Sequence, residues 1–135
     1  MNISKYGGNT IEAMLTKRER RGIHGCVRES WEKLSDSEMS AQLGIDQEYL
    51  YSVTKYLGEV ISHGSTEYRS QSPTLIFVEI GDDEYRLTMS PGDARLIVRC
   101  METALRRVPE WEFHLLMGVY PKEIKELLKQ FQKIL

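Results

Sequence analysis

The chain has few of the features that reveal a function directly. Its only two cysteines, Cys26 and Cys100, lie far apart in sequence. This spacing is typical of free thiols in a reducing compartment, although one bridge between them stays open. The longest apolar run, residues 75–78, is too short to span a bilayer. The first ten residues lack the apolar segment of a signal peptide. We therefore expect a small cytoplasmic protein of bacterial or phage type.

An excess of charge of one sign is also missing. The 135 residues include 18 Lys and Arg against 20 Asp and Glu, a net charge of −2. Such a chain has no overall field that attracts nucleic acid or a membrane surface. Its length is enough for one domain, residues 1–135, with a real core. Two halves, residues 10–64 and 74–135, would be joined by the polar linker 65–73.

The N-terminal part predicts helices. The first ten residues read as a loop-like start. Apolar residues from Thr10 onward recur at helical spacing, so we expect a helix to begin there. Gly22 and Gly25 predict that this helix breaks or kinks, with a second helix over residues 24–34. The apolar face of the first helix would consist of Ile11, Met14 and Leu15.

After the linker the apolar period changes from helical spacing to strict alternation. Residues 76–89 alternate on both sides of the turn 81–83, which predicts a β-hairpin with one buried face. Ser90 and Pro91 predict the start of a helix that ends at Pro109. A short helix over residues 110–117 and a last helix from Pro121 would follow. The hairpin's buried side chains would be Ile76, Val78, Ile80, Tyr85, Leu87 and Met89; the last helix would bury Ile124, Leu127, Leu128, Phe131 and Leu135.

A helix–Gly–helix pattern occurs twice. With Gly44 aligned to Gly118, seven apolar positions of the first copy fall on apolar residues of the second: Met39, Leu43, Ile45, Leu50, Val53, Leu57 and Ile61. In each copy a short helix meets a longer one at a glycine, and the next residue fills the corner between them. In the first copy Ser35 and Glu38 form a capping box. There Asp46 would cap the longer helix, whose apolar face is Leu50, Val53, Leu57 and Ile61. Duplication and chance agreement of two amphipathic periods both stay open.

The first copy resembles the helix-turn-helix of DNA-binding regulators. A small residue at Ser40 or Ala41 precedes Gly44, and Ile45 follows it. A helix before this unit and the hairpin after it have the chain order of a winged helix, over residues 24–89. The resemblance implies a transcriptional regulator. Its DNA contacts would be Arg18, Arg20, Arg21, Gln47, Ser52 and Lys55.

The charges on the reading surface favour a different interpretation. Two carboxylates begin the would-be recognition helix and three more occupy the hairpin tip. Carboxylates at these places repel phosphates. Tyrosines beside them are typical of protein-binding surfaces. We therefore expect a non-catalytic regulatory module, comparable to immunity-type or phage-encoded inhibitor proteins, whose partner has a basic surface. The predicted binding residues are Asp46, Glu48, Tyr49, Tyr51, Asp82, Asp83 and Glu84; a homodimer is also compatible with the sequence.

Catalytic patterns are weak. His24 and Cys26 lie close together in sequence, but no third residue is evident that would orient the histidine. The histidines lack the short paired spacing of a zinc site, and no glycine-rich stretch ends as a phosphate loop does. We expect no enzyme activity, no metal and no cofactor. The predicted fold class is α+β: mostly helical, with one β-hairpin or a small three-stranded sheet.

Overall fold

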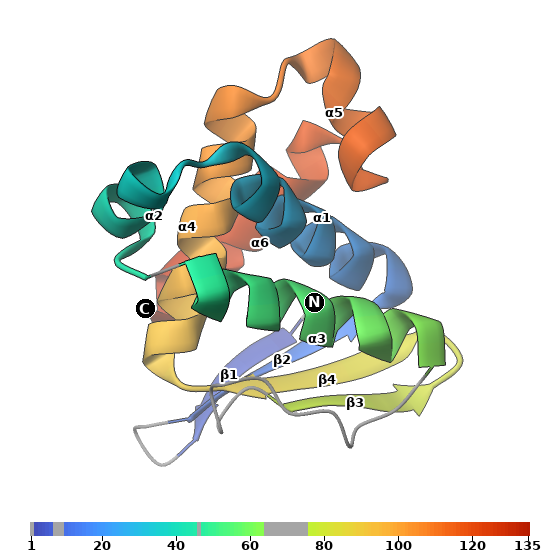
Figure 1. Cartoon of the computed structure of the whole chain (residues 1–135). Helices are drawn as coiled ribbons and strands as arrows, with labels where there is room; N and C mark the ends of the chain where they lie inside the picture. The colour runs from blue at the N-terminus through green and yellow to red at the C-terminus, as the bar shows by residue number, and fades with distance from the viewer. Residues whose placement is uncertain (1, 7–9, 46, 64–75) are drawn as a thin grey trace.

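The structure is a computed structural model, and it describes residues 2–6, 10–45, 47–63 and 76–135. The chain is α+β, with six helices and one antiparallel sheet in this described part (Figure 1). Two strands precede the first three helices, and two more separate them from the last three. The elements are β1 (Asn2–Tyr6), β2 (Thr10–Thr16), α1 (Lys17–Lys33), α2 (Asp36–Leu43), α3 (Gln47–His63), β3 (Ile76–Gly81), β4 (Glu84–Met89), α4 (Pro91–Arg107), α5 (Glu110–Met117) and α6 (Pro121–Ile134).

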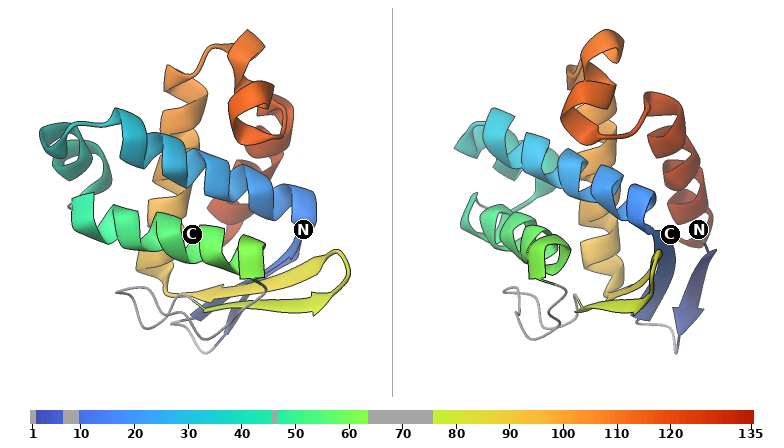
Figure 2. Two further views of the ribbon diagram at one scale, coloured as in Figure 1. Left: turned by 45° about the vertical axis from the view of Figure 1, so that its right-hand side comes forward. Right: turned by 90° about the vertical axis from the view of Figure 1, so that its right-hand side faces the viewer.

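The sheet has four strands in the order β1-β2-β4-β3. The helices lie on one side of it, and α5 is at the end of the molecule farthest from the strands (Figures 1 and 2). In the central pair, Ala13 of β2 is opposite Leu87 of β4, and both side chains are fully buried. The buried apolar side chains of the sheet and of all six helices form one continuous cluster.

The predicted helix from Thr10 is wrong, because residues 10–16 form strand β2. Burial alternates along β2, so Ile11, Ala13 and Leu15 face the core. Four of these seven residues are apolar. Ile11, Met14 and Leu15 fit a helical period, whereas Ile11, Ala13 and Leu15 fit a strand, and it is Ala13 that is buried rather than Met14. The helix begins only at Lys17, where Thr16 and Glu19 form a capping box: the Glu19 amide donates to Thr16 Oγ1 at 3.1 Å.

The predicted loop-like start is also wrong for the part that the structure describes. Asn2–Tyr6 is strand β1, and it pairs with β2 from Asn2 opposite Met14 to Tyr6 opposite Thr10. A first strand of this kind is held by the ladder of backbone hydrogen bonds that its neighbour supplies. Residues 2–6 are thereby tied to the sheet.

The predicted break at Gly22 and Gly25 is wrong as well. Helix α1 runs without interruption through both glycines, and both are buried. A Cβ atom on Gly25 would lie 3.0 Å from Met117 Cα, and one on Gly22 would lie 2.8 Å from Val119 Cγ2. The two glycines thus let the turn between α5 and α6 approach α1 closely. The structure uses them for packing between helices.

The predicted hairpin is confirmed as β3 and β4. Tyr85, Leu87 and Met89 are buried as predicted. Ile80, however, is 47% exposed, because the register shifts between Glu79 and Gly81. The register also sets Phe77 opposite the buried Leu87. The side chains of Ile76 and Val78, like that of Ile61 on α3, lie outside the described residues.

The C-terminal helices begin and end where the sequence predicts. Ser90 Oγ accepts from the Asp93 amide at 3.2 Å to cap α4, with Pro91 in the first helical position. Only Leu135 departs from its prediction, since it is 40% exposed. Helices α2 and α5 each span eight residues, and both end at a left-handed glycine, Gly44 at φ 70° and Gly118 at φ 75°.

Bilayer-spanning helices are not found in the described part of the chain, where no helix is both long and apolar enough. The predicted linker, residues 65–73, and the predicted cap Asp46 lie outside the described residues.

The role assigned to Gly25 predicts the effect of a single methyl group. Alanine there should lower the free energy of unfolding by about 1–2 kcal/mol, because overpacking against Met117 costs more than the roughly 1 kcal/mol gained in helix propensity. Urea unfolding followed by circular dichroism measures this. Gly92→Ala is the matched control, since a Cβ on Gly92 would lie 3.7 Å from its nearest neighbour, Ser90 Oγ. Equal stability of the two variants would contradict the packing role.

Candidate functional site

A broad surface groove of about 1050 Å³ lies at the corner between α2 and α3. Its walls come from the last turns of α1, from α2 and from the first turns of α3. Acidic, amide, hydroxyl and aromatic side chains line it together. The residues that matter below are Trp31, Asp36, Ser40, Gln47, Glu48 and Tyr51.

Two aromatic side chains form the apolar part of the groove. The rings of Trp31 and Tyr51 are 5.1 Å apart between centroids and inclined at 47°. Tilted aromatic pairs at this separation are favourable. Tyr51 keeps 45% of its surface exposed, whereas Trp31 is half-buried. Trp31 was not predicted as a site residue, because its contact with Tyr51 depends on how α1 and α3 pack together, and the sequence pattern does not give that packing.

The acidic part of the groove comes from two helix starts. Asp36 lies in the first turn of α2 and Glu48 in the first turn of α3, and both are exposed. Carboxylates at these places are favoured by the helix dipole, so they also stabilise the helices that carry them. Glu48 and Tyr51 thus lie together, as the sequence predicted. Asp46 lies outside the described residues.

Tyr49 was also predicted for this surface, but its side chain makes contacts within the protein. Its hydroxyl donates to Asp93 Oδ1 at 2.5 Å, which joins the start of α3 to the start of α4. Its ring is half-buried against the core. Tyr49 therefore fixes the position of α3 and exposes less of itself to a partner than Tyr51 does.

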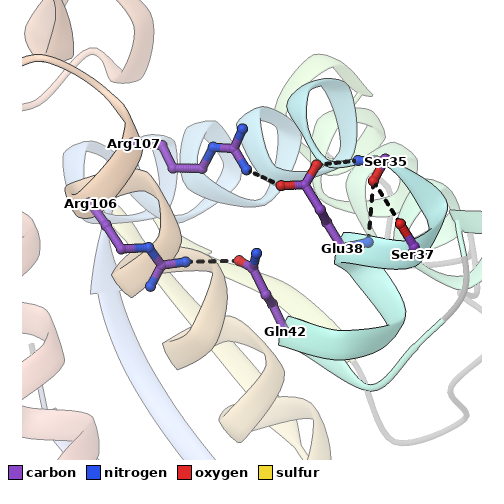
Figure 3. A network of polar contacts seen from close by, with 6 residues as sticks. All are labelled: Ser35, Ser37, Glu38, Gln42, Arg106 and Arg107. Carbon is purple, nitrogen blue, oxygen red and sulfur yellow. Dashed lines mark hydrogen bonds and ion pairs between the residues drawn. The ribbon is translucent and has the colours of Figure 1, made fainter.

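Arginines of α4 hold α2 in place (Figure 3). Arg107 Nη1 donates to Glu38 Oε2 at 2.7 Å, and Arg106 Nη2 donates to Gln42 Oε1 at 2.8 Å. Glu38 also accepts from the Ser35 amide, completing the predicted capping box. The Ser35 amide, followed by Arg107, lowers the pKa of Glu38 to about 2. The outer wall of the groove is therefore a capped helix with a carboxylate that stays ionised.

The acids of the hairpin tip lie elsewhere. Asp82, Asp83 and Glu84 are exposed, but Asp83 Oδ1 accepts from the Lys17 amide at 3.0 Å. This bond satisfies a donor at the start of α1. Trp31 in the groove is 14 residues farther along α1, or roughly 21 Å at the rise of a helix. The two predicted acidic elements are thus at opposite ends of α1.

The residues predicted for DNA binding do not gather on one surface. Arg20 is 2% exposed, with its guanidinium 4.3 Å from the centre of the Tyr85 ring, so its prediction as a DNA contact is wrong. Arg18 Nη2 donates to Glu123 Oε2 at 2.9 Å. Gln47 lies at the groove end of α3, far from the start of α1. The remaining predicted contacts are Arg21 and Lys55, which are exposed, and Ser52, which is half-buried.

The thiols are in a state unsuited to nucleophilic attack. Cys26 and Cys100 are both free and both buried, so the bridge that the sequence left open is not formed. Burial raises the pKa of Cys100 to about 12, and it raises the pKa of Cys26 still further. Nucleophilic cysteines need a lowered pKa. Burial, followed by Arg28 and Arg20, lowers the pKa of His24 to about 4, so this imidazole is neutral at pH 7.

Within the described ranges, no group of three or more His, Cys, Asp or Glu side chains is arranged to hold a metal ion. Comparisons with protein-family models, with curated proteins and with solved structures gave no match to this chain.

The hydrogen bond from the Lys17 amide to Asp83 predicts that Asp83, which the sequence suggested as a partner-binding residue, also stabilises the fold. Asp83→Ala should cost about 0.5–2 kcal/mol of unfolding free energy, the usual range for losing a helix-start acceptor. Asp82→Ala on the same turn is the control and should be nearly neutral. Thermal unfolding of both variants measures the difference. If Asp82→Ala were the more damaging change, the assignment would be wrong.

The lowered pKa of His24 predicts a pH-dependent stability. The unfolded chain, with a His pKa near 6.5, binds more protons than the folded chain between about pH 4 and 6.5. The contribution of His24 is therefore fully present above pH 6.5 and is lost as the pH falls toward 4. Urea unfolding at several pH values between 4.5 and 6.5 should show this loss, and His24→Gln should flatten it. An unchanged slope in that variant would refute the assignment.

Proposed function

We propose that this chain is a non-catalytic protein-binding module of the cytoplasm, and that it binds a partner with a basic surface in the α2–α3 groove. The observation that carries the proposal is the exposed Tyr51 in tilted ring contact with Trp31, with the carboxylates of Asp36 and Glu48 in the same groove. Immunity-type proteins and phage-encoded inhibitors are modules of this general kind.

Aromatic side chains and carboxylates have different roles in such a site. Tryptophan and tyrosine are enriched among the residues that dominate binding energy, because they bury a large area at low entropic cost. Surrounding charges mainly raise the association rate and discriminate between partners. Tyr51 would supply affinity, and Asp36 and Glu48 would select a basic surface over an acidic one.

The groove is held in shape before any partner arrives. Arg99 Nη1 donates to the carbonyl of Leu43, beside the left-handed Gly44. The bond from Tyr49 to Asp93 and the contacts of α2 with Arg106 and Arg107 brace the two walls. A surface fixed in this way loses little conformational entropy on binding. This rigidity supports a role in recognition.

We interpret the N-terminal portion as a winged-helix-like unit adapted to bind protein, and the α5–α6 unit as a second use of the same helix–Gly–helix form. The chain order of α1, α2, α3 and the β3–β4 hairpin supports the first interpretation. Glu48 at the start of α3 and the buried Arg20 argue against DNA as the ligand, because affinity for DNA depends on exposed cations near the groove-facing helix.

A comparison of affinities tests the proposal. The test uses the double variant Tyr51→Ala/Glu48→Lys. Its control is Glu126→Lys, which makes the same charge change on the exposed face of α6. Wild type and both variants would each be immobilised and exposed to lysate of the source cell. A protein retained by wild type and control would then be purified and titrated by calorimetry. We expect the double variant to bind it about 30-fold more weakly or worse, the cost of losing a dominant interface residue. Equal affinities would place the binding site elsewhere.

A fluorescence-anisotropy titration with a mixed-sequence DNA duplex tests the alternative of a DNA-binding regulator. We expect no salt-sensitive binding at low or moderate salt. Salt-sensitive binding that weakens in Lys55→Glu would show that nucleic acid is the ligand.

A further inference from the structure

Helix α5 is apolar on two opposite faces. Phe113 and Met117 are each 1% exposed, and they pack into the core. Trp111 and Leu115 are 77% and 76% exposed. Each of these two lies two residues before a buried one, which is about 200° around a helix. The core therefore uses one face of α5 and leaves a tryptophan and a leucine side by side on the other.

Large apolar side chains that adjoin one another on an exposed surface are a common feature of protein interaction sites. We propose that the Trp111 and Leu115 face of α5 binds a second copy of this chain, in a two-fold contact that forms a weak homodimer. Neither residue lines the α2–α3 groove, so this inference goes beyond the proposed function.

A receiving cleft lies beside this face on the same molecule. It has a volume of about 310 Å³ and lies between the last turns of α1, the end of α4 and the start of α5. Val108, Pro109 and Leu116 supply its apolar part, and Glu32 lies on its α1 side. In the cleft, Glu112 follows Trp111 and Leu116 follows Leu115. Each is therefore turned about 100° around α5 from the exposed face. Each copy thus carries a projecting side chain and an adjacent cleft.

This arrangement is self-complementary. A two-fold axis near α5 brings Trp111 of each copy to the cleft of the other, and such a contact closes on itself without further growth. Figure 1 shows α5 at one end of the molecule, where two copies can approach without their sheets meeting.

The charges along α5 also favour a second copy. Glu110 and Glu112 lie in its first turn. At its other end, Arg28 Nη2 donates to the carbonyl of Leu116 at 2.7 Å, and Arg21 lies against Gly118. Lys33 and Arg107 lie beside Glu112 in the cleft, so the start of α5 carries charges of both signs, whereas its other end is basic. Two antiparallel α5 helices would place the carboxylates of each beside the arginines at the other end of its partner. A partner with charge of one sign would meet like charge at one end.

The test uses Trp111 as its own reporter. The chain has two tryptophans, so Trp31→Phe leaves Trp111 as the only one. In sedimentation equilibrium we expect the mass to rise from 15.7 kDa toward twice that value, with a dissociation constant of about 1–100 μM for so small a contact. The Trp111 emission should shift to the blue over the same concentrations. A monomer with unshifted emission throughout the millimolar range would overturn the proposal.

Two variants test the geometry. Trp111→Ala should weaken the dimer about 30-fold or more, as the loss of a dominant interface residue does. Its fold, checked by circular dichroism, should be unaffected because the side chain is exposed. Glu32→Trp, which fills the cleft from α1, should weaken the dimer similarly, whereas the control Glu126→Trp on α6 should not. A dimer that persists in either Trp111→Ala or Glu32→Trp would overturn the two-fold arrangement.

Discussion

The rest of the structure depends on the close approach of the α5–α6 turn to helix α1. Gly22 and Gly25 have no Cβ, and Val119 and Met117 occupy the space that those atoms would take. This contact sets the inward face of α5 and places Phe113 and Met117 in the core. Because α1 begins at a capping box directly after β2, the same helix connects that packing to the sheet. A methyl group at either glycine would push these layers apart.

The same contact explains why two similar corners differ in what they offer to other molecules. Both corners consist of an eight-residue helix and a left-handed glycine. The α5–α6 corner is covered by α1, so Val119 after its glycine is fully buried. The α2–α3 corner is braced from its sides by Arg99, Arg107 and Tyr49, and Ile45 after its glycine stays half-buried in the wall of a groove. The neighbours of each corner, and not its local geometry, decide whether it is core or surface.

The sequence predicted those elements whose signals are local. The hairpin and the three C-terminal helices follow from alternation, from a cap at Ser90 and from prolines and glycines at helix ends. Strand β2 was not predicted because its seven residues include both Ala13 and Met14, so that Ile11 and Leu15 can be grouped with Met14 as a helix face or with Ala13 as a strand face. Gly22 and Gly25 were misread because the meaning of a buried glycine depends on Val119 and Met117, nearly a hundred residues away.

The candidate site was predictable to the same extent. Glu48 and Tyr51 were predicted for this surface, and both are exposed beside the buried Leu50 and Val53. The contact of Tyr51 with Trp31 was not predicted, because it forms only when α1 and α3 lie antiparallel to each other. Arg20 was expected on the surface with its basic neighbours, yet Tyr85 of a distant strand covers it. The exposed face of α5 did have a local signal: Trp111 and Leu115 are out of phase with Phe113 and Met117.

The packing of α1 against the α5–α6 turn is the claim on which these interpretations depend, and nuclear Overhauser effects test it most directly. A Cβ on Gly25 would lie 3.0 Å from Met117 Cα, so the α-protons of these two residues must be close together. In isotope-labelled protein we expect a strong cross-peak between them, together with cross-peaks from the Gly22 α-protons to the Val119 methyl groups. If both sets were absent while the hairpin cross-peaks were present, the close approach of α1 and the α5–α6 turn would be contradicted.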